Sequence, residues 1–329
     1  MLCRLFNLSE RRFGAHITPC SQRIMHTQKQ LLELWRSLIG SPVNYGFTHS
    51  LALQRKYDFG DFTAELYLQA NGPGTFQRVV MAFPKNATGK LPAVAVPFYF
   101  PEAMLGFELD KPEEALPLYA GIEMMAQLAR RGYVTASADA YHLTYLKSDL
   151  DRGDFNRWAE SGAAINKEHP EWCGIGKLTA DTMLLIDALA QDSRVDAQRI
   201  GIAGHSLGGK MAFYAGCLDE RIKAILASDF GFGWDQTNWN DTWYWGSKVE
   251  ALKARGIDHS SLLGCAAPKP FCLLAGSYDN ADSYAMMQKA PGYENYLDRL
   301  VIYNHATGHR PPLDVLNKGY DFLDEWLKK

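Results

Sequence analysis

The chain has 329 residues, of which 47% are hydrophobic and 22% charged, and its formal net charge is −3. This composition allows a large hydrophobic core. The chain is long for one domain, but its length does not clearly indicate two domains. The net charge offers no basic field for nucleic acid. The longest uncharged apolar stretch, Leu91 to Pro101, is too short to span a membrane and contains three prolines.

The first 24 residues differ from the rest of the chain because four arginines and several hydroxyl residues stand there beside a single acidic residue. This composition is typical of a transit peptide. A translation start placed too far upstream of Met25 explains it equally well. In both cases we expect residues 1–24 to be disordered, and the folded domain to comprise residues 25–329.

The cysteines show neither a metal-ligand spacing nor a disulfide framework. Several lie inside apolar runs, which indicates reduced thiols in the core of a cytoplasmic protein. The six are Cys3, Cys20, Cys173, Cys217, Cys265 and Cys272.

In chain order, residues 30–38 have helical spacing and end before Gly40-Ser41-Pro42. Residues 62–69 alternate between apolar and polar side chains, as a half-buried strand does. Asn71-Gly72-Pro73-Gly74 then turns the chain into a second strand at 76–83. The domain therefore opens with an antiparallel hairpin.

The pattern then changes to short runs that are apolar throughout, separated by segments of helical length, which indicates a parallel sheet covered on both faces. The predicted strands are 91–96, 133–137, 199–203, 222–227, 271–275 and 300–303, and the predicted helices include 119–131, 178–190, 207–218 and one from Leu313 to Leu327. With the hairpin, the sheet has eight predicted strands.

Two connections interrupt this alternation. Residues 141–177 carry mixed charge, two tryptophans and the His169-Pro170 break, and we expect them to form an excursion over the edge of the sheet. Residues 229–246 form a tryptophan-rich loop after the sixth strand. No internal repeat or low-complexity tract is present.

The segment Gly204-His205-Ser206-Leu207-Gly208 fits the pattern G-x-S-x-G between a predicted strand and a predicted helix, which is the context that gives this motif meaning. The glycines leave room for a strained backbone at Ser206. The helix that starts near Leu207 points its free N–H groups at whatever lies over the serine. Leu207 N–H is thus a candidate oxyanion donor.

A serine nucleophile requires a base, and the base requires a carboxylate that fixes its tautomer. In an open α/β sheet these partners follow later strands. Asp279 follows the seventh strand and is favoured over Asp282. His309 follows the eighth strand after Gly308 and is favoured over His305. The His-x-x-x-His spacing also allows a zinc interpretation, which is weak because the pair lies on a loop without a partnered glutamate.

From about Leu66 to its end the chain resembles the α/β-hydrolase superfamily, in which the order Ser, Asp, His is typical. Within it the chain is similar to dienelactone hydrolases and acetyl xylan esterases, on the residues Val195-Asp196 and Arg199-Ile200-Gly201 before the serine, Gly208-Gly209-Lys210 after it, and Asp219 to Ala224. One departure is the third strand, where Ala95 to Pro101 replaces the common His-Gly. The second oxyanion donor must come from this loop, with Tyr99 favoured over Phe98 by position.

The resemblance implies hydrolysis of carboxylic esters through an acyl-enzyme, with no metal or organic cofactor. Ser206 would attack, His309 would carry the proton and Asp279 would hold His309. The alternatives are a glucuronoyl esterase, with Lys210 placed as in that family but Leu207 in place of its usual arginine, a peptidase of the prolyl oligopeptidase type, and a binding protein without turnover.

The tryptophan-rich loop also suggests a substrate. Its tryptophans, Trp234, Trp239, Trp243 and Trp245, alternate with Asp and Asn residues. They could form a hydrophobic plug beneath the loop, or a pocket wall that stacks on a sugar ring. The second interpretation predicts a small acyl group on a polar alcohol, and its failure would indicate a lipid-ester hydrolase. The sequence does not predict the oligomeric state.

Overall fold

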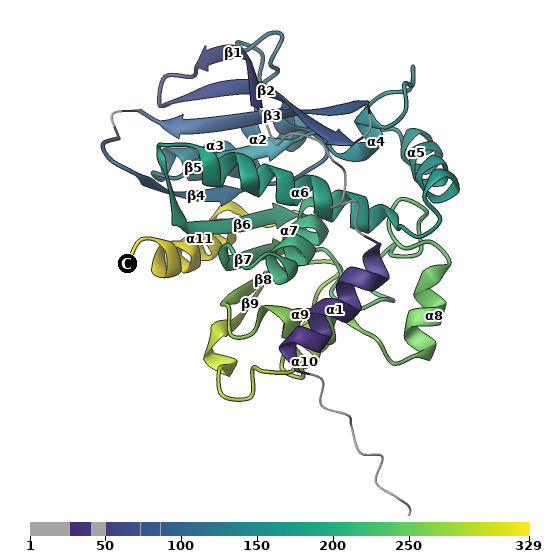
Figure 1. Cartoon of the computed structure of the whole chain (residues 1–329). Coiled ribbons are helices and arrows are strands. Elements are labelled where there is room, and N and C mark those ends of the chain that lie inside the picture. Colours follow the sequence, from purple (N-terminus) through teal and green to yellow (C-terminus); the bar gives the residue numbers. More distant parts are fainter. Residues whose placement is uncertain (1–26, 41–50, 73, 86) are drawn as a thin grey trace, which may run out of the picture.

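The structure is a computed structural model that describes residues 27–40, 51–72, 74–85 and 87–329, so the predicted leader at 1–24 lies outside the described residues. A single mixed sheet of nine strands runs through it in the order β1-β2-β3-β5-β4-β6-β7-β8-β9 (Figure 1). The strands are β1 Leu51–Asp58, β2 Phe62–Gly72, β3 Thr75–Pro84, β4 Leu91–Ala95, β5 Val134–Ala138, β6 Val195–His205, β7 Ile222–Ser228, β8 Phe271–Ala275 and β9 Leu300–Asn304.

The sheet has one strand more than predicted. The extra strand is β1, an edge strand whose side chains are mostly exposed and polar, so it shows no apolar pattern in the sequence. It pairs antiparallel with β2, and β2 pairs antiparallel with β3, which confirms the predicted hairpin. From β5 to β9 every neighbouring pair is parallel, and β5 and β8 are buried along their whole length.

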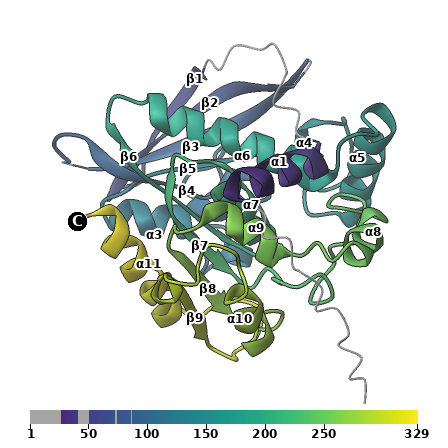
Figure 2. The same ribbon diagram turned by 60° about the horizontal axis from the view of Figure 1, so that its bottom comes forward.

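Helices cover both faces of the sheet, as predicted for strands that are apolar throughout. Helices α1, α6, α7 and α9 share one hydrophobic core on one face, and α2, α3 and α11 share a second core on the other (Figures 1 and 2). The α-helices are α1 Gln28–Ile39, α2 Pro101–Leu105, α3 Met124–Arg130, α4 Tyr141–Thr144, α5 Phe155–Glu168, α6 Gly174–Gln191, α7 Leu207–Leu218, α8 Lys248–Ala254, α9 His259–Ala266, α10 Ala281–Met287 and α11 Leu313–Leu327.

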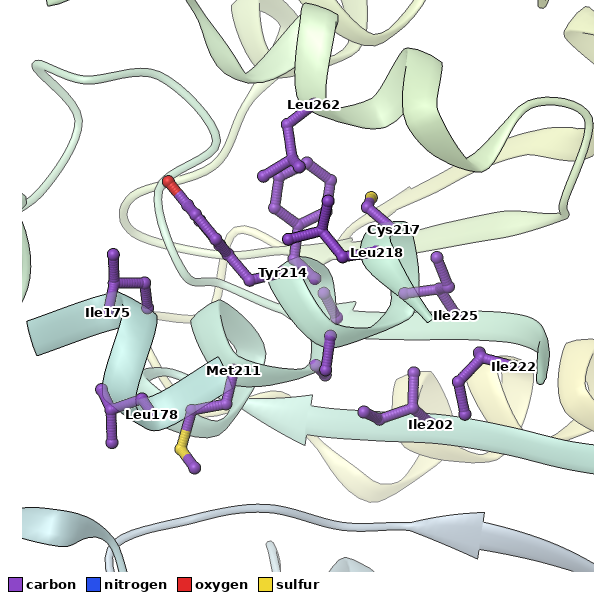
Figure 3. Packing of buried hydrophobic residues seen from close by; sticks show 14 of the residues in the cluster. Ile175, Leu178, Ile202, Met211, Tyr214, Cys217, Leu218, Ile222, Ile225 and Leu262 are labelled. Atoms are coloured by element: carbon purple, nitrogen blue, oxygen red, sulfur yellow. The ribbon is translucent and has the colours of Figure 1, made fainter. Parts of the chain in front are cut away.

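Helix α7, which follows the G-x-S-x-G motif, is buried over its whole length. It lies on β6 and β7 and is covered by α6 and α9, so apolar side chains surround it on all sides (Figure 3). Ile202 and Ile225 face it from the sheet, while Leu178 and Leu262 face it from the covering helices. Full burial stabilises each such side chain by about 1.5–3 kcal/mol. The helix is therefore a rigid support for the residue that precedes it.

A partly buried ion network fixes the end of β5, where the chain enters α4. Arg78 on β3 donates to both oxygens of Asp139 at 2.9 Å and to Glu102 on α2 at 2.6 Å. Asp139 thus fixes the chain at the end of β5 through Arg78, and it does not line the pocket described below. Because breaking a buried pair leaves a charge without its partner, this network holds the β5 end and α2 together.

A second charged cluster predicts a specific acid dependence of stability. Glu65 on β2 accepts hydrogen bonds from Arg194 at 2.7 Å and Tyr67 at 2.5 Å, and it pairs with Lys56 at 2.9 Å. Burial raises the pKa of Glu65, but these partners outweigh burial and lower the pKa to about 2. A lowered carboxylate pKa stabilises the fold above the unfolded pKa and loses that effect as pH falls toward the folded one.

We therefore expect Glu65→Gln to reduce the free energy of unfolding at neutral pH by about 1–2 kcal/mol, less than the full shift because solvent partly screens the pair. Urea unfolding between about pH 7 and pH 2 should show the gap to the wild-type protein closing below about pH 4.5. A gap that stays constant over that range would contradict this role of Glu65.

The described residues contain four cysteines, Cys173, Cys217, Cys265 and Cys272, and all four are buried free thiols. Cys3 and Cys20 lie outside the described residues. Among the helices that the structure describes, none is both long and apolar enough to cross a bilayer.

Candidate active site

Ser206 stands at the junction of β6 and α7 with a strained backbone, φ 56° and ψ −118°. Such a conformation is costly for a residue with a side chain and persists only where the surroundings enforce it. The glycines of the motif make it possible. A Cβ on Gly204 would lie 2.1 Å from the carbonyl oxygen of Gly208, and a Cβ on Gly208 would lie 2.2 Å from that of Pro97. The motif forms the sharp strand-to-helix turn that its spacing predicts, referred to below as the elbow.

His309 is the histidine that the structure brings to this elbow. It lies in the loop between β9 and α11, after Gly308, whose φ of 111° suits a residue without a side chain. Its ring lines the same pocket as Ser206 and stands 4.5 Å from the ring of His205, the residue before the serine. His305 instead binds Thr307 through its Nδ1 at 2.7 Å and does not line the pocket.

The carboxylate against His309 is Asp229, which directly follows β7. Its Oδ2 lies 2.7 Å from His309 Nδ1, and the Asp229 side chain is fully buried. The pairing holds Nδ1 and leaves Nε2 as the ring nitrogen available to Ser206. Asp229 has a φ of 42°, so the chain turns sharply as it leaves the strand.

Four backbone N–H groups also reach the Asp229 carboxylate, those of residues 276, 277, 278 and 279, each at 2.9 Å. Burial raises the pKa of Asp229, but the hydrogen bonds from His309 and from these N–H groups outweigh it and hold the pKa below its ordinary value. The carboxylate is therefore charged at neutral pH and suited to stabilise an imidazolium at His309.

Asp279 makes no contact of this kind with His309, which corrects the predicted pairing. Its carboxylate accepts hydrogen bonds from the backbone of Phe230, Gly231 and Phe232 at 2.6–2.9 Å and from Ser283 at 2.9 Å. Burial raises the pKa of Asp279. The two aspartates thus hold the two loops together. The Asp229 carboxylate accepts from the backbone N–H of Asp279, and the Asp279 carboxylate accepts from that of Phe230, which follows Asp229. Asp282, the second candidate, is exposed.

The elbow opens into a pocket of about 490 Å³. Aromatic side chains from the excursion and from the β4–α2 loop form one wall, and the N-terminal part of the tryptophan-rich loop supplies polar groups. The lining residues are Tyr99, Phe155, Trp158, Ser206, Lys210, Asp229, Phe230, Thr237, Asn238, Tyr244, Tyr278 and His309. The volume falls in the range of sites for small molecules.

None of the four tryptophans predicted to bind substrate lines this pocket. Trp239 and Trp245 donate their indole N–H groups to Gly231 and Tyr214 at 2.7 and 2.8 Å, and Trp234 donates to Ile257 at 2.9 Å. Trp243 is buried and stacks on Phe155. The indole N–H groups of the other three tryptophans are satisfied inside the protein, which favours the hydrophobic plug.

The aromatic wall comes from residues that the sequence pattern did not single out. Trp158 on α5 is 3% exposed, and its ring stacks on that of Tyr99 at 4.4 Å. Phe155, one turn earlier on the same helix, is 62% exposed at the pocket mouth. The excursion therefore lies against the site, and its last part, from Gly174, already belongs to α6. The sequence pattern that could have indicated this wall is a phenylalanine and a tryptophan three residues apart on one helix.

Lys210 is the buried cation of the pocket. It is 2% exposed, donates to Asn238 at 3.2 Å, and lies 4.0 Å above the ring of Trp239. Burial lowers the pKa of its ammonium group well below the ordinary value, although Asp241 and Asp279 oppose this effect. A poorly solvated amine at this depth is suited to donate a hydrogen bond to a ligand hydroxyl.

Leu207 begins α7, so its N–H has no hydrogen-bond partner within the helix. Tyr99 lies in the loop between β4 and α2, and its carbonyl oxygen accepts from Ala140 N at 3.0 Å. Among the residues that the structure describes, no group of three or more His, Cys, Asp or Glu side chains is arranged to hold a metal ion.

Comparison with known proteins gives related sequences. A family model described as glucuronyl esterase of fungi matches residues 175–239, which include the elbow. YtaP of Bacillus subtilis (strain 168), named as a hydrolase, is 26% identical over 165 residues, which are 46% of this chain and 54% of YtaP. The chain thus matches about half the length of this curated relative.

Solved structures share the fold at low sequence identity. A Bacteroides fragilis protein named as an acetyl xylan esterase matches 86% of this chain and 76% of its own, with a TM-score of 0.68 at 16% identity. The glucuronoyl esterase of Solibacter usitatus matches 90% and 91%, with a TM-score of 0.66 at 14% identity. That of Teredinibacter turnerae matches 91% and 84%, with 0.65 at 18%. The chain therefore has the α/β-hydrolase fold, its structural neighbours are named as esterases, and its curated relative is named as a hydrolase.

Proposed function

We propose that this protein is a serine esterase that cleaves carboxylic esters of small acyl groups through an acyl-enzyme. The observation that carries the proposal is the strained Ser206 in one pocket with His309, whose Nδ1 is held by buried Asp229. Strain of this kind clusters at functional sites, and the three residue types are those that nucleophilic acyl transfer requires.

In the proposed reaction, His309 Nε2 takes the proton of Ser206 while Oγ attacks the ester carbonyl. Asp229 fixes the tautomer of His309 and stabilises the imidazolium. The N–H of Leu207, with the positive end of the α7 dipole behind it, stabilises the developing oxyanion. His309 then protonates the leaving alcohol, and a water molecule activated by the same histidine releases the acid.

The polar groups of the pocket favour an alcohol or acid that carries hydroxyls. Lys210, Thr237 and Asn238 line the pocket, and so do the stacked rings of Tyr99 and Trp158. A pocket that combines flat apolar faces with hydrogen-bonding groups suits a ring-shaped polar molecule such as a sugar. This replaces the predicted role of the tryptophans in the 229–246 loop.

We expect acetate esters to have a higher kcat/KM than octanoate esters by about tenfold or more, because burying a long acyl chain against Lys210 and Asn238 would break their hydrogen bonding. A series of p-nitrophenyl esters of increasing chain length tests this directly. A preference for octanoate would indicate a lipid-ester hydrolase instead.

A glucuronoyl esterase is the second candidate, because the matched family segment, 175–239, contains both Lys210 and Asn238 of the pocket. In that case the sugar carries the acid and not the alcohol. Methyl glucuronate and acetylated xylose, assayed side by side, separate the two. Turnover of the methyl ester alone would select the second candidate.

A further inference from the structure

Tyr99 faces the elbow with its side chain, whereas its position in the sequence suggested only a backbone donor. Tyr99 lines the pocket together with Ser206, and its phenol lies close enough to interact with the serine side chain. The phenol is therefore next to the oxygen that attacks the substrate, on a loop that leaves the neighbouring strand.

The Tyr99 ring is fixed from several sides. It stacks on Trp158 with ring centres 4.4 Å apart and planes 21° apart, and Phe98 contacts it edge-on at 4.5 Å. The hydrogen bond from Ala140 N to its carbonyl oxygen anchors the backbone. A donor held in place before the reaction needs little reorganisation when charge develops, which is the condition for effective oxyanion stabilisation.

We propose that the Tyr99 phenol is the second donor of the oxyanion hole, acting with the N–H of Leu207. The inference rests on the proposed esterase function. When Ser206 Oγ bonds to the carbonyl carbon, the π electron pair of the C=O bond moves onto its oxygen, and the serine proton passes to His309. The phenol donates a hydrogen bond to the new oxyanion and keeps its own proton. Collapse of the intermediate re-forms C=O and breaks the bond to the alcohol.

Two observations support a donor role for the phenol. Burial raises the pKa of Tyr99, so the phenol remains protonated throughout the pH range in which esters are assayed. The side chain of Leu207 is apolar, so the residue after the nucleophile contributes only its backbone. Lys210, which also lines the pocket, directs its amine to Asn238 and to the ring of Trp239.

The test is Tyr99→Phe, which removes only the hydroxyl and keeps the ring on Trp158. With p-nitrophenyl acetate we expect kcat to fall by about 10²–10³-fold with KM nearly unchanged, as for the loss of one oxyanion donor. The affinity for phenylboronic acid, which forms a tetrahedral adduct with the serine, should fall by a similar factor. Tyr119→Phe is the matched control, because Tyr119 packs on Phe98 from outside the pocket.

The outcomes separate this inference from the proposed function. If the wild-type protein hydrolyses the ester and Ser206→Ala does not, the esterase stands whatever Tyr99→Phe shows. A kcat within about twofold of wild type in Tyr99→Phe would contradict the donor role of the phenol and assign the second donor to the loop backbone. An increase in KM at constant kcat would show a binding role and overturn it as well.

Discussion

Ester turnover should fall by about 10⁴–10⁶-fold in Ser206→Ala, because Ser206 is the hydroxyl that the strained elbow presents to the pocket, while the Thr237 hydroxyl donates to Asn238. The Asp229 carboxylate already binds His309 and four backbone N–H groups. The Lys210 amine donates a hydrogen bond to Asn238. The residual rate would come from the oxyanion hole and from binding alone. The measurement is kcat/KM for p-nitrophenyl acetate with purified protein.

Ser247→Ala is a matched control for this loss. Ser247 is exposed before α8, and its side chain caps no backbone group, so its variant should hydrolyse the ester like the wild-type protein. If Ser206→Ala retained more than about a tenth of the wild-type rate, Ser206 would lose its role as nucleophile.

Asp229→Asn should lower kcat by about 10⁴-fold, the effect known for an amide in place of the triad carboxylate. The amide can donate to His309 Nδ1, which favours the wrong tautomer, and it carries no charge to stabilise the imidazolium. Its shape is retained, so the loss should appear in kcat without unfolding of the protein. Circular dichroism and thermal unfolding of the variant check that point.

Asp279→Asn is the paired variant, since it changes the other buried aspartate of the same two loops. Its carboxylate binds only backbone N–H groups and Ser283, so we expect a smaller loss of activity, about tenfold, together with lower thermal stability. The reverse ranking of the two variants would return the triad carboxylate to Asp279.

Much of the fold could be predicted from the sequence, because parallel strands buried on both faces leave continuous apolar runs between helical segments. All six predicted parallel-sheet strands and the hairpin are present. The edge strand β1 escaped prediction because its exposed positions carry Gln54, Arg55 and Lys56, residues typical of an edge that must not aggregate.

The nucleophile elbow could also be predicted, because backbone strain at Ser206 demands bare neighbours and so leaves a glycine pattern in the sequence. The acid could not be chosen in the same way. Asp229 and Asp279 both follow buried strands and both satisfy the chain order of serine, acid and histidine. Only the fold decides between them, since the turn at Asp229 directs its carboxylate to His309 while Asp279 faces the backbone of the neighbouring loop.

The four tryptophans of the 229–246 loop do not line the pocket, for a related reason. Tryptophans are large and often buried, so their density shows where the loop packs. Phe230 and Tyr244 of the same loop do line the pocket, and two further aromatic residues, Phe155 and Trp158, come from a distant excursion. Their place depends on how α5 folds back over the sheet, which no local pattern specifies.

Labelling with a fluorophosphonate, followed by peptide mapping, tests the central claim most directly, because the probe reacts only with an activated nucleophile beside an oxyanion hole. We expect one phosphonyl group per chain, on Ser206, and a labelling rate that falls by several orders of magnitude in His309→Ala but not in His305→Ala. Labelling of another residue, or an undiminished rate in His309→Ala, would contradict a Ser206–His309–Asp229 esterase.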